Sequence, residues 1–327
     1  QKYLNRRKPR RSKFTTQRKE SDQAEILSGV FGGRTTGTPI SILVHNQDQK
    51  SRDYSNIMNT YRPGHADYTF DAKYGFRDYR GGGRSSGRET IGRVAAGAVA
   101  CKVLESLGIQ VMAYTKSIGP VSIPEQDYDY SVITDNTLYM PNNQYAEKAS
   151  AYLEECIRSQ DSSGGIIECR VDHMPAGIGE TVFEKLDANL AKAMMSIGAV
   201  KGFEIGDGFQ AAKASGSQNN DAFSSNSDGI HKETNHSGGV LGGMSDGSTI
   251  VLRAAIKPTP SISQPQDTVD KDGKSLSLTI HGRHDPVIVP RAVVVVESMT
   301  AITLVDMLFQ NMAARMDKIA EFYSKTR

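Results

Sequence analysis

The sequence has few cysteines and no long apolar run, and these absences exclude several classes of protein. Its 327 residues include three cysteines, Cys101, Cys156 and Cys169, and no Cys-x-x-Cys pair. An odd number without that spacing predicts neither a disulfide framework nor a zinc site. No uninterrupted apolar run reaches the ~18 residues of a membrane span. The basic N-terminus lacks the apolar core of a signal peptide, so we expect a cytoplasmic protein with no metal and no membrane partner.

Positive charge is concentrated in two places, although the net charge is only +2. One is the segment 2–19, and the other is a group of four arginines around a glycine cluster at 77–88. Such local charge attracts polyanions, which include nucleic acid, phosphorylated metabolites and nucleotide cofactors. A solvated basic tail is the alternative interpretation of the first segment. Its basic residues are Lys2, Arg6, Arg7, Lys8, Arg10, Arg11, Lys13, Arg18 and Lys19.

Hydrophobic periodicity predicts a mixed α+β protein. Because strands and helices do not alternate one for one, we expect substantial antiparallel sheet rather than a doubly wound sheet. In the first long helix, Gly92 and Gly97 would permit close packing. Predicted strands lie at 26–30, 38–45, 110–121, 165–174, 200–205, 249–256, 276–281 and 292–297. Predicted helices lie at 89–107, 143–160, 181–197 and 298–323.

Three polar, glycine-bearing segments are longer than ordinary connections between elements. They cover 46–90, 206–248 and 257–286 and hold five of the seven histidines. Segments of that length are usually functional or disordered. The concentration of histidines favours function.

The segment 77–89 could bind an anion through its glycines and arginines. Ser86 and Glu89 have the spacing of a capping box at the start of a helix. The three glycines before them would let backbone N–H groups approach an anion. Arg84 and Arg88 could add forked donors suited to phosphate. A flexible loop before a well-capped helix is the alternative, and the P-loop and dinucleotide glycine motifs are absent.

Two other segments contain histidines that could act chemically. In 61–67, a Pro-Gly turn could present His65 as a proton donor, with its tautomer fixed by Asp67 or by a backbone group. The alternative is a structural, hydrogen-bonding histidine. The segment 281–286 gathers four ionisable groups at a strand end, but no further ligand cluster supports a metal site there.

Glycine pairs and prolines mark two further candidate segments. The paired glycines of 235–243 would let a planar ring or its ribityl chain lie close to the backbone. Pro258 and Pro260 rigidify a strand exit that carries Lys257. Each signal is common by itself.

Together, eight segments in the same order resemble the chorismate synthase family over nearly the whole chain. Any one of them could arise by chance, but eight in register are highly specific. They are Thr15–Arg18 with Ser28–Phe31, Thr35–Pro39, Arg62–Asp67, Arg80–Ser86, Glu204–Phe209, Lys257–Ser261 and Gly282–Pro286.

The resemblance implies a fold and an activity. The fold would be a large β-α-β sandwich with antiparallel sheets, one domain over 1–327, assembled as a homotetramer. The activity would be that of a carbon–oxygen lyase acting on phosphates. With reduced FMN it would eliminate phosphate from 5-enolpyruvylshikimate 3-phosphate to give chorismate, the last common step toward the aromatic amino acids. NADPH would act only indirectly, as reductant.

Residue roles follow from the same resemblance. His65 would protonate reduced flavin, and Asp285 would help the flavin to act as a base. Arg7 and Lys13 match basic positions associated with the phosphate-bearing substrate or NADP. FMN contacts would fall on Arg84, Ser85, Ser86, Gly198, Ala199, Gly242, Lys257, Pro258, Thr259, Pro260, Ser261 and Arg283.

The sequence departs from the family at its start, and other functions stay open. The family begins about forty residues earlier, with a strand and a Gly-Glu-Ser-His-Gly loop; a polypeptide that began at Gln1 should fold but turn over slowly. A nucleic-acid-binding protein is one alternative, although only Tyr3, Phe14 and Tyr79 accompany its basic residues. A flavin-binding homologue without catalysis is another. Because no nicotinamide motif is visible, we expect externally reduced FMN rather than an intrinsic flavin reductase.

Overall fold

The computed structural model describes residues 1–9, 12–15, 20–47, 57–80, 82–227, 229–280 and 285–325. Within this part, the chain divides into two compact units, each assembled from three stretches. Unit 1 consists of Gln1–Ala95, Thr115–Ile166 and Ile256–Val294, and unit 2 of Ala96–Tyr114, Ile167–Ala255 and Val295–Arg327. That residues 1–327 form one domain stays a prediction.

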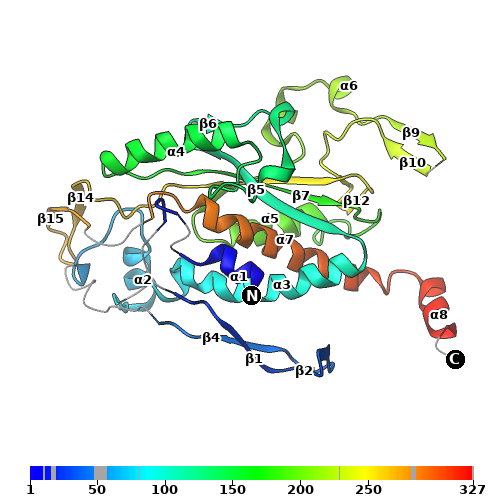
Figure 1. Cartoon of the computed structure of the whole chain (residues 1–327), viewed down its shortest axis with the longest axis horizontal. Coiled ribbons are helices and arrows are strands. Elements are labelled where there is room, and N and C mark those ends of the chain that lie inside the picture. Colours follow the sequence, from blue (N-terminus) through cyan, green and yellow to red (C-terminus); the bar gives the residue numbers. More distant parts are fainter. Residues whose placement is uncertain are drawn as a thin grey trace. The chain divides into compact units, whose positions relative to one another are not determined.

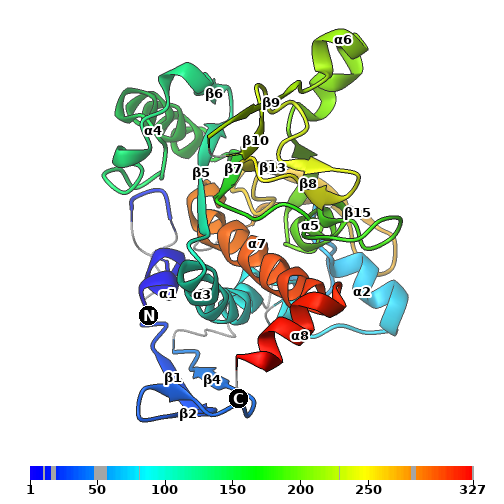
Figure 2. The same cartoon turned by 90° about the vertical axis from the view of Figure 1, so that its right-hand side faces the viewer.

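The largest sheet has five strands, in the order β6-β5-β7-β13-β8. Figure 1 labels β5, β6 and β7, and Figure 2 labels β8 and β13. Strand β13 lies within the strand predicted at 249–256, and alternate side chains, from Ile250 to Ile256, are buried. Strands β5 and β6 pair antiparallel, with Ser117 opposite Ser122. The mixture of helices and antiparallel sheets confirms the predicted α+β class. The strands are β5 (Gln110–Ile118), β6 (Val121–Ser122), β7 (Gly165–Asp172), β8 (Val200–Ile205) and β13 (Ile250–Ile256).

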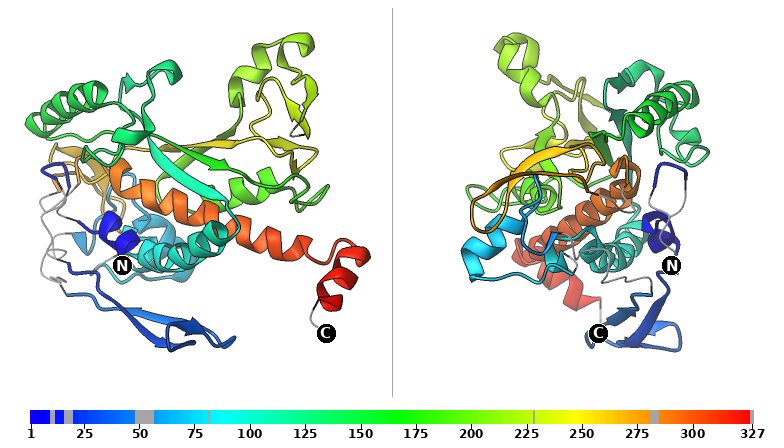
Figure 3. Two further views of the ribbon diagram at one scale, coloured as in Figure 1. Left: turned by 45° about the vertical axis from the view of Figure 1, so that its right-hand side comes forward. Right: turned by 90° about the vertical axis from the view of Figure 1, so that its left-hand side faces the viewer.

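Among the described residues, three α-helices and three small antiparallel hairpins lie wholly within unit 1. Helix α4 begins at the N-cap Asn142, whose side chain accepts hydrogen bonds from two backbone N–H groups. The hairpin of β1 and β4 is an extended two-stranded ribbon (Figure 3). The helices are α1 (Lys2–Arg7), α2 (Asp67–Tyr74) and α4 (Asn143–Arg158). The paired strands are β1 (Ala24–Ser28) with β4 (Ser41–Val44), β2 (Val30–Phe31) with β3 (Arg34–Thr35), and β14 (Gln266–Val269) with β15 (Ser275–Leu278).

The described residues of unit 2 include the helices α5, α6 and α8 and two further hairpins. Helix α5 lies beside β8 (Figure 2). At the base of one hairpin, the buried Lys232 ammonium pairs with Asp221 and Asp246. The elements are α5 (Leu186–Met195), α6 (Gly216–Asn219), α8 (Met316–Ser324), β9 (Phe223–Asn226) with β10 (Gly229–Lys232), and β11 (Val240–Leu241) with β12 (Met244–Ser245).

Two long helices, α3 (Thr90–Ser106) and α7 (Val289–Asn311), contribute residues to both units. In unit 2 they approach closely: a Cβ on Gly97 would lie 2.2 Å from the Cβ of Ser298. The prediction of close packing is therefore confirmed at Gly97. It is wrong at Gly92, where a Cβ would meet no heavy atom of the described residues within 4 Å.

Helix α7 corrects the prediction of a strand at 292–297. The four valines Val293–Val296 are β-branched, but all four are buried and helical. A continuous apolar run fits a buried helix as well as a buried strand, and tertiary packing decides between them. The helix predicted at 298–323 is confirmed as helical but not as one helix, because α7 ends at Asn311 and α8 begins at Met316. By length and composition α7 could cross a membrane, but 61% of its most apolar window is buried inside the protein.

The three cysteines are thiols in buried surroundings and not disulfides. Cys169 on β7 is fully buried, and its burial raises the pKa of the thiol above the ordinary value. The prediction that no disulfide framework exists is therefore confirmed.

Candidate active site

The loop that carries His65 is held at both ends. At its start, the Tyr61 backbone N–H donates to the Val269 carbonyl at 3.1 Å, next to a bridge between Thr60 and Asp270. At its end, two guanidinium nitrogens of Arg62 donate to the two Asp67 carboxylate oxygens, each at 2.8 Å. Burial would raise the pKa of Asp67, but the hydrogen bonds and charge of Arg62 outweigh it and lower that pKa. Hairpin β14–β15 and the start of α2 therefore position this loop.

His65 is held as a neutral ring in one tautomer. Its Nδ1 lies 2.9 Å from the Pro63 carbonyl oxygen and its Nε2 lies 2.8 Å from the Ser261 hydroxyl. Because a carbonyl can only accept, Nδ1 carries the proton and Nε2 accepts from Ser261. Burial, followed by the charge of Arg62, lowers the pKa of His65 from 6.5 to about 4. A backbone group, rather than Asp67, thus fixes the tautomer.

The segment 257–261 packs against the His65 loop. Lys257 Nζ donates to the Gly64 carbonyl at 2.8 Å. Gly64 has a φ of +68°, and a Cβ there would lie 2.7 Å from the Cβ of Pro260, so this approach requires glycine. The Thr259 carbonyl accepts from the Ser162 hydroxyl at 2.6 Å, while Thr259 Oγ1 is buried without a hydrogen-bond partner among the described residues.

Asp285 is connected to this group through the backbone. The Ser163 N–H donates to the Pro286 carbonyl at 2.8 Å, beside the Ser162 that binds Thr259. Asp285 itself accepts from Arg291 Nη1 at 2.7 Å. Unit 1 therefore brings together His65, the segment 257–261 and the Asp285 turn through a continuous series of hydrogen bonds.

Arg7 is buried, and its donors point at protein groups. Its Nε donates to Thr90 Oγ1 at 2.9 Å, its Nη1 to Asp22 at 3.2 Å and its Nη2 to the Gly87 carbonyl at 2.6 Å. Burial, with the nearby charge of Arg291, lowers the pKa of Arg7 to about 10. Whether Arg7 contacts a ligand stays a prediction, as it does for Lys13, which forms an exposed ion pair with Glu154 of α4.

The predicted capping box at Ser86 and Glu89 is wrong. Ser86 makes no side-chain cap, and its hydroxyl donates back to the Gly83 carbonyl at 2.9 Å. Glu89 instead pairs with Arg93 at 2.9 Å, one turn further along α3. Two 3₁₀ turns, η2 (Gly83–Ser85) and η3 (Gly87–Glu89), separate the glycines from α3, which begins at Thr90. Such turns are common at helix starts.

Arg84 and Arg88, the two arginines predicted to offer forked donors to phosphate, differ in their contacts. Arg88 is engaged, because it lies near the Glu20 and Asp22 carboxylates and donates to the His45 carbonyl. Arg84 is exposed and makes no hydrogen bond or ion pair with any described residue. Ser85, beside it, donates to the Gly82 carbonyl at 2.6 Å. Of these two arginines, Arg84 is therefore the one whose donors meet no partner in the described part of the chain.

The other predicted site residues lie elsewhere in the chain. Gly198, Ala199 and Gly242 belong to unit 2. Ala199 has a φ of 72°, a strained conformation for a residue with a side chain, and Gly242 has a φ of 60°. Arg283, with the two histidines of its segment, lies outside the described residues. Across the described ranges, no group of three or more His, Cys, Asp or Glu could hold a metal ion.

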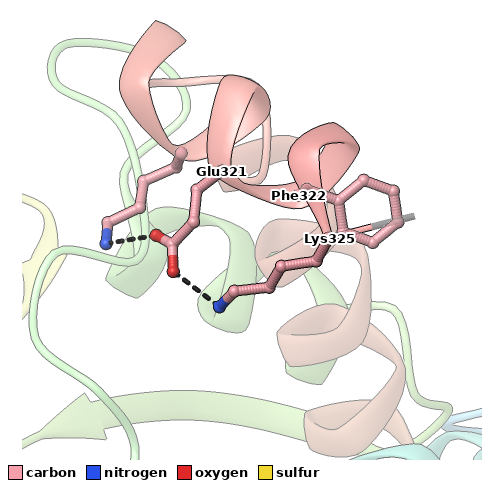
Figure 4. Close-up of a pocket in the computed structure, with 4 residues that line it drawn as sticks. Glu321, Phe322 and Lys325 are labelled. Atoms are coloured by element: carbon pink, nitrogen blue, oxygen red, sulfur yellow. Dashed lines mark hydrogen bonds and ion pairs between the residues drawn. The ribbon is translucent and has the colours of Figure 1, made fainter. Parts of the chain in front are cut away.

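A pocket on α8 holds none of these residues. Figure 4 shows Glu321 between two lysine ammonium groups, with the Phe322 ring on the neighbouring face. Lys318 Nζ lies 3.1 Å and Lys325 Nζ 2.8 Å from the Glu321 carboxylate. These are surface ion pairs along one helix and carry little energy.

Sequence reasoning missed the residues that support the site. Ser261 was a predicted flavin contact, but its hydrogen bond to His65 joins residues 196 positions apart. Arg291 directly precedes the strand predicted at 292–297, and no motif marks it. Asp22 and Thr90, which bind Arg7, likewise gave no signal, because single polar residues between elements are common.

Together, the fold and the grouped polar residues are those of an α+β enzyme. The family profile described as chorismate synthase matches residues 1–309. A chorismate synthase from Agathobacter rectalis is 66% identical, with 99% of this chain and 88% of that protein covered. One from Chloroflexus aurantiacus is 52% identical, with 96% and 86% covered. A crystal structure of chorismate synthase matches with a TM-score of 0.72 and 32% identity, over 93% of this chain and 83% of that one. The chain belongs to the chorismate synthase family, and its activity is that of a lyase.

Proposed function

We propose that this chain eliminates phosphate from 5-enolpyruvylshikimate 3-phosphate to give chorismate, with reduced FMN as cofactor. The observation that carries the proposal is the direct contact of His65 with Ser261 and of its loop with Lys257. These residues were predicted from separate motifs, and unit 1 brings them together. Membership of the family supports the same reaction.

The residues present fit a flavin mononucleotide. Thr259 Oγ1 is a buried oxygen without a partner among the described residues, and Arg84 is an exposed cation with none. A Cβ on Gly198 would meet no heavy atom within 4 Å, which leaves room beside the backbone. When bound, reduced FMN would supply an electron transiently and recover it, which makes a difficult elimination possible. The residues proposed to hold it are Arg84, Ser85, Ser86, Gly198, Ala199, Gly242, Lys257, Pro258, Thr259, Pro260, Ser261 and Arg283.

Cationic side chains offset the charge of the substrate in this proposal. The substrate carries two carboxylates and a phosphate, so several positive groups are needed to bind it. Lys257 and Arg62 both lower the pKa of His65 by their charge. A bound phosphate would offset that charge and raise the pKa of His65 again. Nε2 would then take up a proton from water, and the Ser261 hydroxyl would turn so that its oxygen accepts a hydrogen bond from Nε2–H. The protonated ring could then act as a proton donor.

We further propose a source of reduced FMN, an oligomeric state and a cellular location. NADPH would act only through an external reductant of FMN, the protein would assemble as a homotetramer, and it would work in the cytoplasm. These proposals extend what the family membership supports.

An anaerobic assay tests the proposed function. Purified protein, chemically reduced FMN and substrate are mixed, and both phosphate and chorismate are followed. We expect the two products in equal amounts, and no product when the reductant is omitted. Phosphate release without reductant would contradict the proposal. Binding of FMN without any phosphate release would identify a homologue that has lost catalysis.

A further inference from the structure

Arg291 bridges two segments that are distant in the sequence. It lies in the first turn of α7. Its Nη1 donates to Asp285 Oδ2 at 2.7 Å, and its Nε donates to the Arg7 carbonyl at 3.2 Å. One guanidinium group can make both contacts because its donors form a fixed fork. Lysine, with a single ammonium, has no such fork.

The second contact satisfies a helix end. Arg7 is the last residue of α1, and the terminal carbonyls of a helix have no partner within the helix. A basic side chain at this end is also favoured by the helix dipole. Since the Arg7 side chain binds Asp22, Gly87 and Thr90, the carbonyl that Arg291 uses is itself fixed.

The pair of Arg291 and Asp285 is shielded from water. The exposed fractions of the two side chains are 22% and 12%. Exposed ion pairs are weak because water and salt screen them, whereas shielded pairs lose much more when one partner is removed. The contact therefore has enough strength to define the orientation of the Asp285 carboxylate.

We propose that Arg291 is a positioning residue, which holds the Asp285 carboxylate against the C-terminal end of α1. The assignment rests on the proposed function, in which Asp285 takes part in catalysis. Arg291 acts through Asp285 and makes no contact of its own with the reacting groups. A small displacement of a reacting group can lower a rate by about 100-fold.

A double-mutant cycle on kcat tests the proposal. We expect Arg291→Ala and Asp285→Asn each to lower kcat by about 100-fold, and the double variant to be no slower than Asp285→Asn. A merely structural role would give effects that multiply. Arg291→Lys should retain more activity than Arg291→Ala, because it keeps the charge beside Asp285. If Arg291→Ala does not fold, the same cycle is measured with Arg291→Lys.

Two further measurements separate this inference from the proposed function. Arg315→Ala removes an exposed pair with Asp317 on α8 and should leave kcat unchanged. Hydrogen exchange needs no turnover: Arg291→Ala should speed exchange in peptides from α1, and Arg315→Ala should not. An inactive wild-type protein would contradict the proposed function but not the role of Arg291, which hydrogen exchange would still test. Unchanged exchange in α1, or multiplying losses in kcat, would overturn the role of Arg291.

Discussion

His65 shows how its surroundings set the charge of one side chain. Its folded-state pKa of about 4 lies below the ordinary 6.5, so between these values the unfolded chain binds the extra proton. The neutral ring therefore adds stability above pH 6.5, and this stability is lost as the pH falls toward 4. The loss from this one group is about 2 kcal/mol at pH 5.

Replacing His65 should remove that pH dependence. We expect the free energy of unfolding of His65→Gln to fall less between pH 7 and pH 5 than that of the wild-type protein, because glutamine does not titrate. Urea denaturation at the two pH values measures this. His231→Gln, whose ring is exposed on β10, is the control and should follow the wild type. Equal pH dependence in both variants would rule out a buried neutral His65.

Gly64 determines how closely the His65 loop approaches the segment 257–261. Gly64→Ala would place a methyl group 2.7 Å from Pro260 Cβ. It would also put a side chain on a residue whose φ is left-handed, a conformation that side chains avoid. We expect FMN binding to weaken at least about tenfold, a change of ~1.4 kcal/mol, as measured by flavin fluorescence. Gly75→Ala has the same strain, with a φ of +79°, but meets no atom within 4 Å. The Gly75→Ala control should bind FMN normally. An equal loss of FMN affinity in both variants would mean that backbone strain, and not the contact with Pro260, weakens binding.

Helices α3 and α7 also approach each other closely at a glycine, Gly97. Gly97→Ala would place a methyl group on the Ser298 side chain, and we expect the free energy of unfolding to fall by about 2 kcal/mol. Gly92→Ala adds a methyl group on the same helix where none of the described residues comes within 4 Å. It should be neutral or stabilise by up to ~1 kcal/mol, because alanine favours the helix. Thermal and urea denaturation compare the two, and similar stabilities would contradict the close approach.

Elements with strong periodicity were predictable, and those decided by packing were not. Helix α4 buries the apolar stripe that its sequence shows, and strand β13 falls inside a predicted apolar run. The segment 292–297 has β-branched residues that favour a strand locally, and only burial on all sides makes it a helix. Helix α2 carries few buried side chains, so its sequence gave no apolar stripe. The turns before α3 depended on local hydrogen bonds that residue types alone do not determine.

For the molecule as a whole, the motifs identified the site, but their supports could not be found from the sequence. His65, Lys257 and Ser261 stood in recognisable segments, and the structure of unit 1 joins them. The hydrogen bond of Arg291 to the Arg7 carbonyl links residues 284 positions apart, without any pattern that marks either end. Such contacts depend on the path of the whole chain.

Ligand binding should stabilise the whole protein by mass action. FMN at ~100 times its dissociation constant should raise the free energy of unfolding by about 2.7 kcal/mol, which a thermal shift assay detects as a higher Tm. Riboflavin, which lacks the phosphate, is the control. If Arg84 and Lys257 contact that phosphate, the smaller molecule should give a smaller shift at equal concentration. Equal shifts would argue against a phosphate site in the protein.

The buried thiols have a practical consequence for work without oxygen. Cys169 is kept from ionising by its surroundings, and Cys101 and Cys156 are also buried. Thiolates are the form that reacts with oxidants and disulfides. Dithionite or air can therefore be used to set the oxidation state of an added flavin while the three thiols stay shielded from the solution.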